Sequence, residues 1–408
     1  MKTTYKILMF LIAVHGVASA QVVPAATGPS PVPPGGKSFE YAVRYSQTAQ
    51  FGSSFSTLQT ATGSGSLTYI NNNERTPFTA EYSGGYTWTL TGPGFESGQF
   101  QRVFLTQGID WKKWKVMLSD DASYLPQSPL TGFSGIPGIG EPIGGTTTVP
   151  SSTQSILNLS THVIENNGSG LLEFDPTKST SISGGGNSVL LRYPNGDGLD
   201  TDTLSANATV IHTLNARDSL TATYLYSNFT YPDYLVTFET KSGLIGLVHK
   251  WTRNLTTNFS AGPELLTSSV VPDSMDVTVG ASIEYLLRFS SFGLSYDRGT
   301  TGGSGYLFGA KVNTVSGNYQ REFAPDWSMG LTGGYRETGD LTDNGVTRGI
   351  FAGAEATRRF GQDVIVFANY TATTQSTTAT LPTNALSQLL NMIGFGVGYS
   401  PRPRRLRQ

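Results

Sequence analysis

The stretch from Asp276 to Tyr296 constrains the possible folds more than any other part of the sequence. Its odd positions from 277 to 289 are all apolar or aromatic, and the even positions between them include Glu284 and Arg288. Successive side chains of a strand point to opposite faces, so this pattern predicts a strand with one apolar and one polar face. A tilted strand needs about 9–11 residues to cross a bilayer, whereas most strands have about 5 or 6. The length of the alternation therefore favours a strand that crosses a membrane.

A second strand follows directly. After two serines, the apolar residues move to even positions: Phe292, Leu294 and Tyr296. This change of parity predicts a two-residue turn at 290–291 that places residues 289 and 292 opposite each other on one face. Similar alternation recurs from Phe39 onward, so we expect a chain built mostly of membrane-spanning hairpins.

The composition excludes several classes of protein. The 408 residues carry a formal net charge of −2, contain no cysteine and are 14% charged, whereas soluble domains are about 25% charged. The chain is therefore not basic enough for a typical nucleic-acid-binding protein and not charged enough for a disordered one. Without cysteine it has neither a disulfide framework nor a thiolate metal site.

The first twenty residues have the pattern of a signal peptide. Lys2 and Lys6 precede an apolar run over 7–14, and the small residues 18–20 form a cleavage site. The alternative, an N-terminal anchor helix, needs a longer apolar run, and no later window is apolar enough for a helical span. We expect a signal peptide at 1–20, a Pro- and Gly-rich periplasmic linker at 21–36, a barrel at 37–400 and a basic periplasmic tail at 401–408.

Tight turns and longer loops alternate along the predicted barrel, which is the arrangement of bacterial outer-membrane barrels. Besides 290–291, tight turns are expected at 216–217, 253–254, 324–325 and 361–362. Aromatic residues gather at both ends of the strands, as they do at the two edges of a membrane. The belt beside the tight turns comprises Trp251, Phe289, Phe292, Phe323, Trp327, Phe360 and Tyr399. The belt beside the longer loops comprises Tyr226, Phe229, Tyr296, Tyr306, Phe308, Tyr335, Phe351 and Tyr370.

These patterns predict an all-β fold, a closed antiparallel transmembrane β-barrel of about 16–18 strands. A barrel of this size leaves an aqueous channel, whereas about 8 strands would be filled by side chains. A soluble β-sandwich is the structural alternative, against which the long strands and the two aromatic belts argue.

Residues 121–156 interrupt the alternation with five prolines and a glycine cluster. The segment is expected to be the third outward loop, and loops of this length are usually functional. Two positions remain open for it: folded into the lumen as a mainly neutral lid or lining, or outside on the surface.

The chain resembles the bacterial outer-membrane β-barrel proteins, and porins in particular, from about Phe39 to Tyr399. The final apolar run is similar to the closing strand that outer-membrane assembly machinery recognises: Ile393, Phe395, Val397 and Tyr399. The sequence departs from that pattern because Ser400 and a basic tail follow the last aromatic. In general porins the third loop forms an acidic constriction. Here only Asp120, Asp121 and Glu141 are charged in or beside the segment, so a charge filter is not supported.

The polar face of the strands supplies the candidate pore-lining residues. They are Glu40, Arg44, Glu81, Glu239, Lys241, Glu284, Arg288, Lys311 and Glu355. Charges facing lipid at the midplane would cost about 2–4 kcal/mol, whereas a lumen tolerates them. Five of the nine are acidic and four are basic, so the near balance predicts a weakly selective pore. Alternatively, some of them pair across strands as structural ladders.

The sequence gives little support for a catalytic or ligand-binding site. The histidines of the mature chain are His162, His212 and His249, and their spacing gives no Ser–His–Asp or paired Asp–His arrangement. The aspartates of the 195–202 turn lack the spacing of a calcium loop, and the glycine groups do not form a nucleotide-binding unit. No catalytic residue, cofactor or metal site is predicted.

The sequence therefore favours an outer-membrane channel for passive diffusion of small hydrophilic solutes. A structural or surface-interaction barrel whose lumen is blocked by residues 121–156 is the alternative, and a barrel enzyme is the third hypothesis. The expected partners are outer-membrane lipids and lipopolysaccharide, small hydrophilic solutes and the outer-membrane assembly machinery. Nucleic acid is not expected, and a homo-oligomer remains open.

Overall fold

A computed structural model describes most of the chain. The described residues are 36–52, 55–92, 97–127, 161–194, 198–303, 307–324, 326–342, 345–361, 363–378, 389–401 and 404–405. The expected signal peptide, nearly all of the expected linker and residues 128–160 lie outside them. Within the described residues, no helix is long and apolar enough to cross a membrane.

The described part of the chain forms eighteen long strands and one two-residue strand. In chain order they are β1 (Lys37–Gly52), β2 (Phe55–Asn71), β3 (Phe78–Thr91), β4 (Gly98–Asp110), β5 (Trp114–Gln127), β6 (Thr161–Phe174), β7 (Thr180–Arg192), β8 (Thr201–Thr213), β9 (Asp218–Tyr231), β10 (Val236–Lys250), β11 (Leu255–Ser268), β12 (Ser274–Leu286), β13 (Ser290–Thr301), β14 (Ala310–Ala324), β15 (Trp327–Asp340), β16 (Val346–Phe360), β17 (Val364–Thr377), β18 (Leu390–Tyr399) and β19 (Arg404–Arg405). Each long strand pairs antiparallel with its neighbour in sequence.

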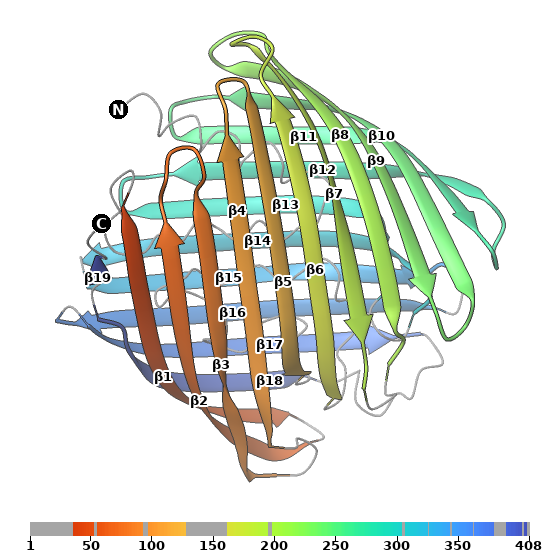
Figure 1. Cartoon of the computed structure of the whole chain (residues 1–408). Coiled ribbons are helices and arrows are strands. Elements are labelled where there is room, and N and C mark those ends of the chain that lie inside the picture. Colours follow the sequence, from red (N-terminus) through yellow and green to blue (C-terminus); the bar gives the residue numbers. More distant parts are fainter. Residues whose placement is uncertain are drawn as a thin grey trace.

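The sheet closes on itself where the first long strand meets the last. β1 and β18 pair antiparallel from Val43↔Tyr399 to Gly52↔Leu390. In Figure 1 the nearer strands β1 to β8 cross in front of the farther strands β12 to β18, as tilted strands on opposite walls of a barrel do. Closure removes the unpaired edges that a membrane could not solvate. The prediction of a closed antiparallel barrel is therefore confirmed, with eighteen strands at the upper end of the expected range.

The connections differ between the two rims. We call the rim at which β1 begins and β18 ends the turn rim, and the opposite one the far rim. The connections contain 2–6 residues at the turn rim and 2–33 residues at the far rim. The segment between β5 and β6 is the third connection on the far rim. However, β5 continues to Gln127, so strand occupies the first seven residues of the predicted 121–156 loop. In the basic tail, the backbone of β19 pairs with Ser38 and Phe39 of β1.

The hairpin of β12 and β13 forms, but its turn lies elsewhere than predicted. β12 ends at Leu286 and β13 begins at Ser290, so residues 287–289 form the connection. Phe292 therefore faces Tyr285 instead of Phe289. The predicted 290–291 turn was wrong because parity alone cannot separate registers that differ by an even number of residues. Each of these registers places Phe292 opposite an outward aromatic residue.

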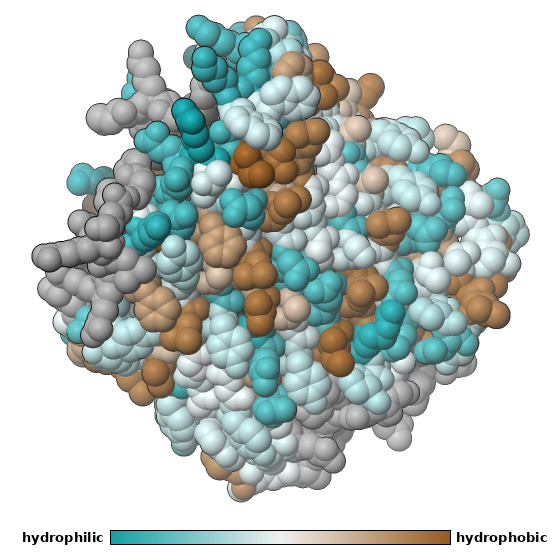
Figure 2. Space-filling model, viewed as in Figure 1, coloured by the Kyte–Doolittle hydropathy of each residue, from teal (hydrophilic) through white to brown (hydrophobic). Residues whose placement is uncertain are grey.

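The apolar face of the strands forms the outside of the barrel. Val277 is 49% exposed and Phe395 is 56% exposed, although both are large and apolar. Figure 2 shows apolar side chains spread over the outer surface of the nearer strands among paler and more polar ones. A β-sandwich would bury these side chains between two sheets, so the structural alternative is excluded. An outer face of this kind is stable only against hydrocarbon, and the barrel spans a membrane.

Candidate functional site

The inner wall of the barrel is the candidate functional site. Along each strand, the positions that alternate with the exposed apolar side chains point into the barrel. Five of the nine predicted lining residues occupy inward positions. They are Glu40 on β1, Arg44 on β1, Glu81 on β3, Glu284 on β12 and Glu355 on β16. Their role in lining a pore stays a prediction.

Glu239 and Lys241 are the first correction, because both lie on the outer face of β10. They share that face with Ile245, which is 72% exposed. The alternate positions of this strand include Phe238 and Leu244, which are buried inside. The assignment from sequence failed because the inner face of β10 is apolar near the far rim. The two charged side chains instead form an ion pair, with Lys241 Nζ 3.2 Å from Glu239 Oε2.

Arg288 and Lys311 are also misplaced by the sequence pattern. Arg288 lies in the exposed 287–289 connection at the turn rim, with its guanidinium 4.9 Å from the centre of the Phe289 ring. Lys311 shares the outer face of β14 with the exposed Val315, because the neighbouring Ala310 and Val312 are buried inside. Three of the four basic residues that were expected to line the lumen therefore lie elsewhere.

An ion-paired group that the sequence did not reveal lies on the inner face of β3 to β6. Arg102 on β4 binds Asp121 on β5 through two hydrogen bonds, Nε to Oδ1 at 2.8 Å and Nη2 to Oδ2 at 2.6 Å. Two inward carboxylates flank this pair, Glu81 on β3 and Glu165 on β6. The sequence did contain one signal for this group. Arg102 and Phe100 are two residues apart on one strand and therefore share a face, so an inward Arg102 means that the Phe100 ring also faces inward.

Aromatic rings on the inner wall lie over glycines. A Cβ placed on Gly85 would come within 2.6 Å of Cζ of Phe100, and one on Gly334 would lie equally close to Cζ of Phe351. Phe367 lies over Gly396 in the same way, and the Arg44 guanidinium lies 4.5 Å from the centre of the Phe367 ring. Each ring is thus buried against backbone and projects little into the lumen. The surface that faces the lumen can therefore be mostly polar even though some aromatic residues point inward.

The far rim carries an apolar cluster inside the barrel, which we call the mouth cluster. Its buried members are Leu199, Phe229, Tyr231, Phe238 and Leu266, and Val236, Val271, Phe308 and Leu341 pack against them. Tyr231 anchors the connection between β13 and β14, because its hydroxyl accepts a hydrogen bond from the Gly309 N–H at 2.7 Å and donates one to the Gly302 carbonyl. Far-rim connections therefore fold over the inside of the mouth.

The two predicted aromatic belts differ in outcome. All seven residues of the turn-rim belt are exposed. In the far-rim belt Tyr335 and Tyr370 are exposed outside, whereas Phe229, Phe308 and Phe351 face inward, which corrects their assignment. Tyr226 and Tyr296 are half-buried at outward positions, and Tyr306 lies outside the described residues.

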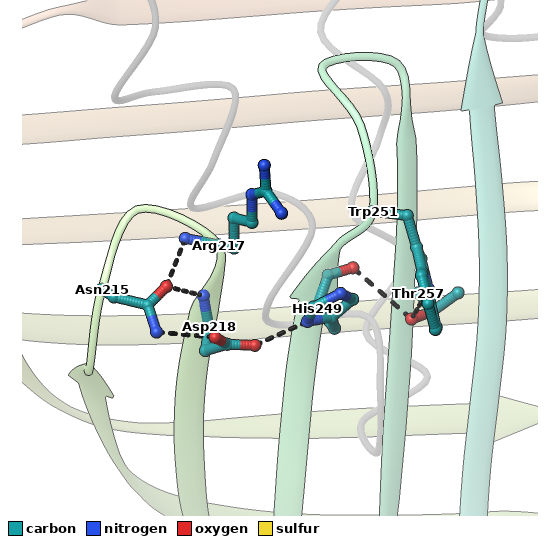
Figure 3. Close-up of polar contacts among 6 residues, drawn as sticks. All are labelled: Asn215, Arg217, Asp218, His249, Trp251 and Thr257. Carbon is teal, nitrogen blue, oxygen red and sulfur yellow. Dashed lines mark hydrogen bonds and ion pairs between the residues drawn. The ribbon is translucent and has the colours of Figure 1, made fainter.

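The histidines lie at strand ends. His249 Nδ1 and Asp218 Oδ1 are 2.6 Å apart at the turn rim, where Asn215 also donates to Asp218, as Figure 3 shows. These hydrogen bonds, that from His249 first, hold the pKa of the Asp218 carboxyl below its ordinary value. His249 and Asp218 thus form a hydrogen-bonded Asp–His pair, although the spacing in sequence did not predict one. The nearby Thr257 hydroxyl donates to the His249 carbonyl and accepts from Trp251 Nε1. Neither contact activates a nucleophile.

The remaining candidates show no ligand set. His212 Nδ1 lies 3.0 Å from the Thr180 hydroxyl on the outer face, and the His162 side chain lies outside the described residues. Arg192 holds Asp200 and Asp202 at the far rim. Among the described residues, no group of three or more His, Asp or Glu side chains could hold a metal ion.

Comparisons with known proteins agree with the architecture. No protein-family model and no curated protein matches the sequence. Among solved structures, the chain is similar to OccK2 (OpdF) of Pseudomonas aeruginosa, with a TM-score of 0.50, 10% identity and coverage of 91% of this chain and 98% of that one. OccAB4 of Acinetobacter baumannii gives a TM-score of 0.49 and 9% identity over 92% of this chain and 100% of that one. The Pseudomonas aeruginosa outer membrane protein opdK gives 0.49 and 11% over 89% and 98%. At these identities the likeness concerns the fold alone, and the chain shares the closed barrel fold of OccK2.

Proposed function

We propose that this protein is an outer-membrane channel through which small hydrophilic solutes diffuse passively. The carrying observation is the closed barrel of eighteen strands, apolar outside and largely polar inside. A barrel of 16–18 strands has room for an aqueous channel. Its mechanism is filtering by size and charge without covalent chemistry.

Small polar side chains dominate the inner wall and support free passage. Several of them join neighbouring strands through hydroxyl pairs, such as Ser119 with Ser169 at 2.6 Å and Ser295 with Ser316 at 2.8 Å. These short side chains satisfy one another at the wall and leave the axis of the barrel to water. A wall of this kind binds no particular solute tightly, so the channel is expected to discriminate only weakly among small solutes.

A structural or surface-interaction barrel with a closed lumen is the second candidate. The mouth cluster favours it, because apolar side chains and folded connections cover part of the inner face at the far rim. The third far-rim connection, which contains residues 128–160, would complete such a plug. We expect the channel to stay open because the mouth cluster involves only the strands and connections of one arc, β7 to β16.

Single-channel recording separates these functions. Refolded protein whose barrel is shown intact by heat-modifiable gel migration is added to a planar bilayer, where the proposal predicts ion-conducting steps. A folded protein that stays silent contradicts it. Deletion of residues 130–150 leaves β5 and β6 intact. A large rise in conductance on deletion would identify that segment as a plug, and an unchanged conductance would place it outside the conduction path.

We do not propose an enzyme. Replacing His212 and His249 together should leave conductance unchanged, because His249 lies at the turn rim and His212 on the outer face. Around the barrel we expect outer-membrane lipids and lipopolysaccharide. The closing strand β18 is the expected contact for the assembly machinery, and co-migration of differently tagged copies tests for a homo-oligomer.

A further inference from the structure

We propose that the lumen prefers cations, so that the solutes it favours are small organic or inorganic cations. The inference rests on the proposed channel function. Its starting point is the correction of the lining residues: the loss of Lys241, Arg288 and Lys311 from the inner wall removes three positive charges, whereas the loss of Glu239 removes one negative charge. The near balance expected from the sequence is thereby lost.

A full count of the inner wall strengthens this imbalance. The count takes inward positions of the described strands and leaves out the first and last residue of each strand. Eleven are acidic: Glu40, Glu81, Asp121, Glu165, Glu173, Glu264, Asp276, Glu284, Asp297, Glu322 and Glu355. Five are basic: Arg44, Arg102, Lys115, Arg336 and Arg359. The difference of eleven and five leaves six formal negative charges on the wall, and four remain when Arg298 and Lys311, which bind Asp276, are added to the basic residues.

Several of the basic groups are already committed to carboxylates. Arg102 binds Asp121 through two hydrogen bonds, and Lys115 lies 3.3 Å from Glu173. The flanking Glu81 and Glu165 therefore share with Asp121 a single guanidinium on this arc of the wall. One positive charge among three carboxylates leaves the arc negative.

The arc formed by β11, β12 and β13 is acidic as well. Its inward charges are Glu264, Asp276, Glu284 and Asp297, and these three strands carry no inward basic residue. Asp276 is neutralised from the outer face by Arg298 at 2.8 Å and Lys311 at 3.0 Å. The other three remain on the inner side, where Glu264 is buried among hydroxyl donors such as Thr278. Acidic charge thus lies on two separate arcs of the wall.

The two longest segments that the structure does not describe between strands add no basic residue. Residues 128–160 contain one charged residue, Glu141, and residues 379–388 contain none. Wherever the long third connection lies, it adds no positive charge to the lumen. A water-filled passage with low-dielectric walls concentrates the field of its wall charges, which raises the local concentration of counter-ions. We expect potassium to be favoured over chloride about fivefold, an effect that high salt weakens by screening.

The reversal potential of the bilayer-inserted protein under a KCl gradient tests the inference. The expected sign is that of cation preference, and it should weaken in the variant Glu81→Gln/Glu284→Gln/Glu355→Gln. The matched control, Glu239→Gln/Glu337→Gln, removes carboxylates from the outer face and should leave the reversal potential unchanged. Glu284→Gln alone, should the triple variant fold poorly, is expected to give a smaller shift in the same direction.

The outcomes distinguish this inference from the channel function. A conducting wild-type protein that prefers chloride or neither ion overturns cation preference and leaves the channel intact. The inference is also overturned if the inner variants and the outer control change the cation preference equally, because the inner wall is then not the source of that preference. A folded protein without conductance overturns both. Liposome swelling should likewise be faster with lysine than with glutamate, two solutes of similar size and opposite charge.

Discussion

Tyr231 offers the sharpest test of how the far-rim mouth is held. Its side chain is fully buried. Its hydroxyl accepts from the Gly309 N–H and donates to the Gly302 carbonyl, so one oxygen atom fixes both ends of the connection between β13 and β14. Tyr231→Phe keeps the ring and its edge contact with Phe308, whose centre lies 5.2 Å away, and removes the hydroxyl alone.

The size of the effect follows from these two hydrogen bonds. The variant leaves a backbone donor and a backbone acceptor without their partner in a buried place, which costs about 1–3 kcal/mol. Because about 1.4 kcal/mol is a tenfold change in an equilibrium constant, a cost of about 2 kcal/mol shifts the balance between the docked and released connection by about thirtyfold. The barrel strands do not depend on this contact, so the barrel itself should remain folded.

Single-channel recordings measure the released fraction directly. Tyr231→Phe should spend more time in a state of higher conductance or show more rapid current fluctuations. Tyr234→Phe is the matched control, because Tyr234 also packs on Phe308 but is exposed, and it should behave as wild type. If Tyr231→Phe gives a current trace indistinguishable from both, the hydroxyl does not hold the mouth and the reasoning fails.

Three further predictions concern stability. Arg102→Gln should lower the free energy of unfolding in urea by about 1–3 kcal/mol because it strands carboxylates on the inner wall, and adding Asp121→Asn should recover part of the loss. Gly334→Ala should cost about 1–3 kcal/mol because its new Cβ would collide with the Val315 carbonyl and the Phe351 ring, whereas Gly243→Ala, with nothing within 4 Å of its new Cβ, should be nearly neutral; melting temperatures in one detergent check the pair. Because its pKa is lowered from 3.8 in the folded state, the Asp218 carboxylate contributes stability that is present above the ordinary pKa and lost as pH falls through the lowered one. Asp218→Asn should therefore flatten the dependence of melting temperature on pH below about 4, and unchanged curves would contradict the role of its histidine partner.

The architecture was predictable because it depends on a pattern that every strand repeats. Alternation along 277–286 fixes which side chains of β12 meet lipid, and the structure exposes Val277 and Ile283 as that pattern requires. Registers and turn positions carry less information, since an even shift preserves both faces. The turn after Leu286 differs from the predicted one for that reason.

The lining residues were harder to predict where the inner wall is apolar. On β10 and β14 the polar positions were taken as inward, but Phe238 and Val312 occupy the inner face there. The burial of Phe238 depends on the mouth cluster, to which the far-rim connections contribute and which local alternation does not encode. The inward Phe100 depends likewise on Gly85, which belongs to the neighbouring strand β3.

Pairing distinguishes charges on the two faces of this barrel better than local polarity does. On the outer face Glu239 is paired with Lys241 and Glu337 with Arg348, with N–O separations of 3.2 and 2.7 Å. A lone charge facing lipid carries a cost that grows toward the midplane, whereas a pair near the rim carries much less. On the inner wall a carboxylate can be held without a close ion pair: Glu355 accepts a hydrogen bond from the Thr357 hydroxyl at 3.2 Å, and Arg44 acts on it only at longer range. The outer face therefore keeps its charges in opposite pairs, against aromatic rings as Arg358 does with Phe360, or with an amide donor as Asp120 does with Asn166. The lumen can accumulate charge of one sign, and this asymmetry allows the acidic excess of the wall.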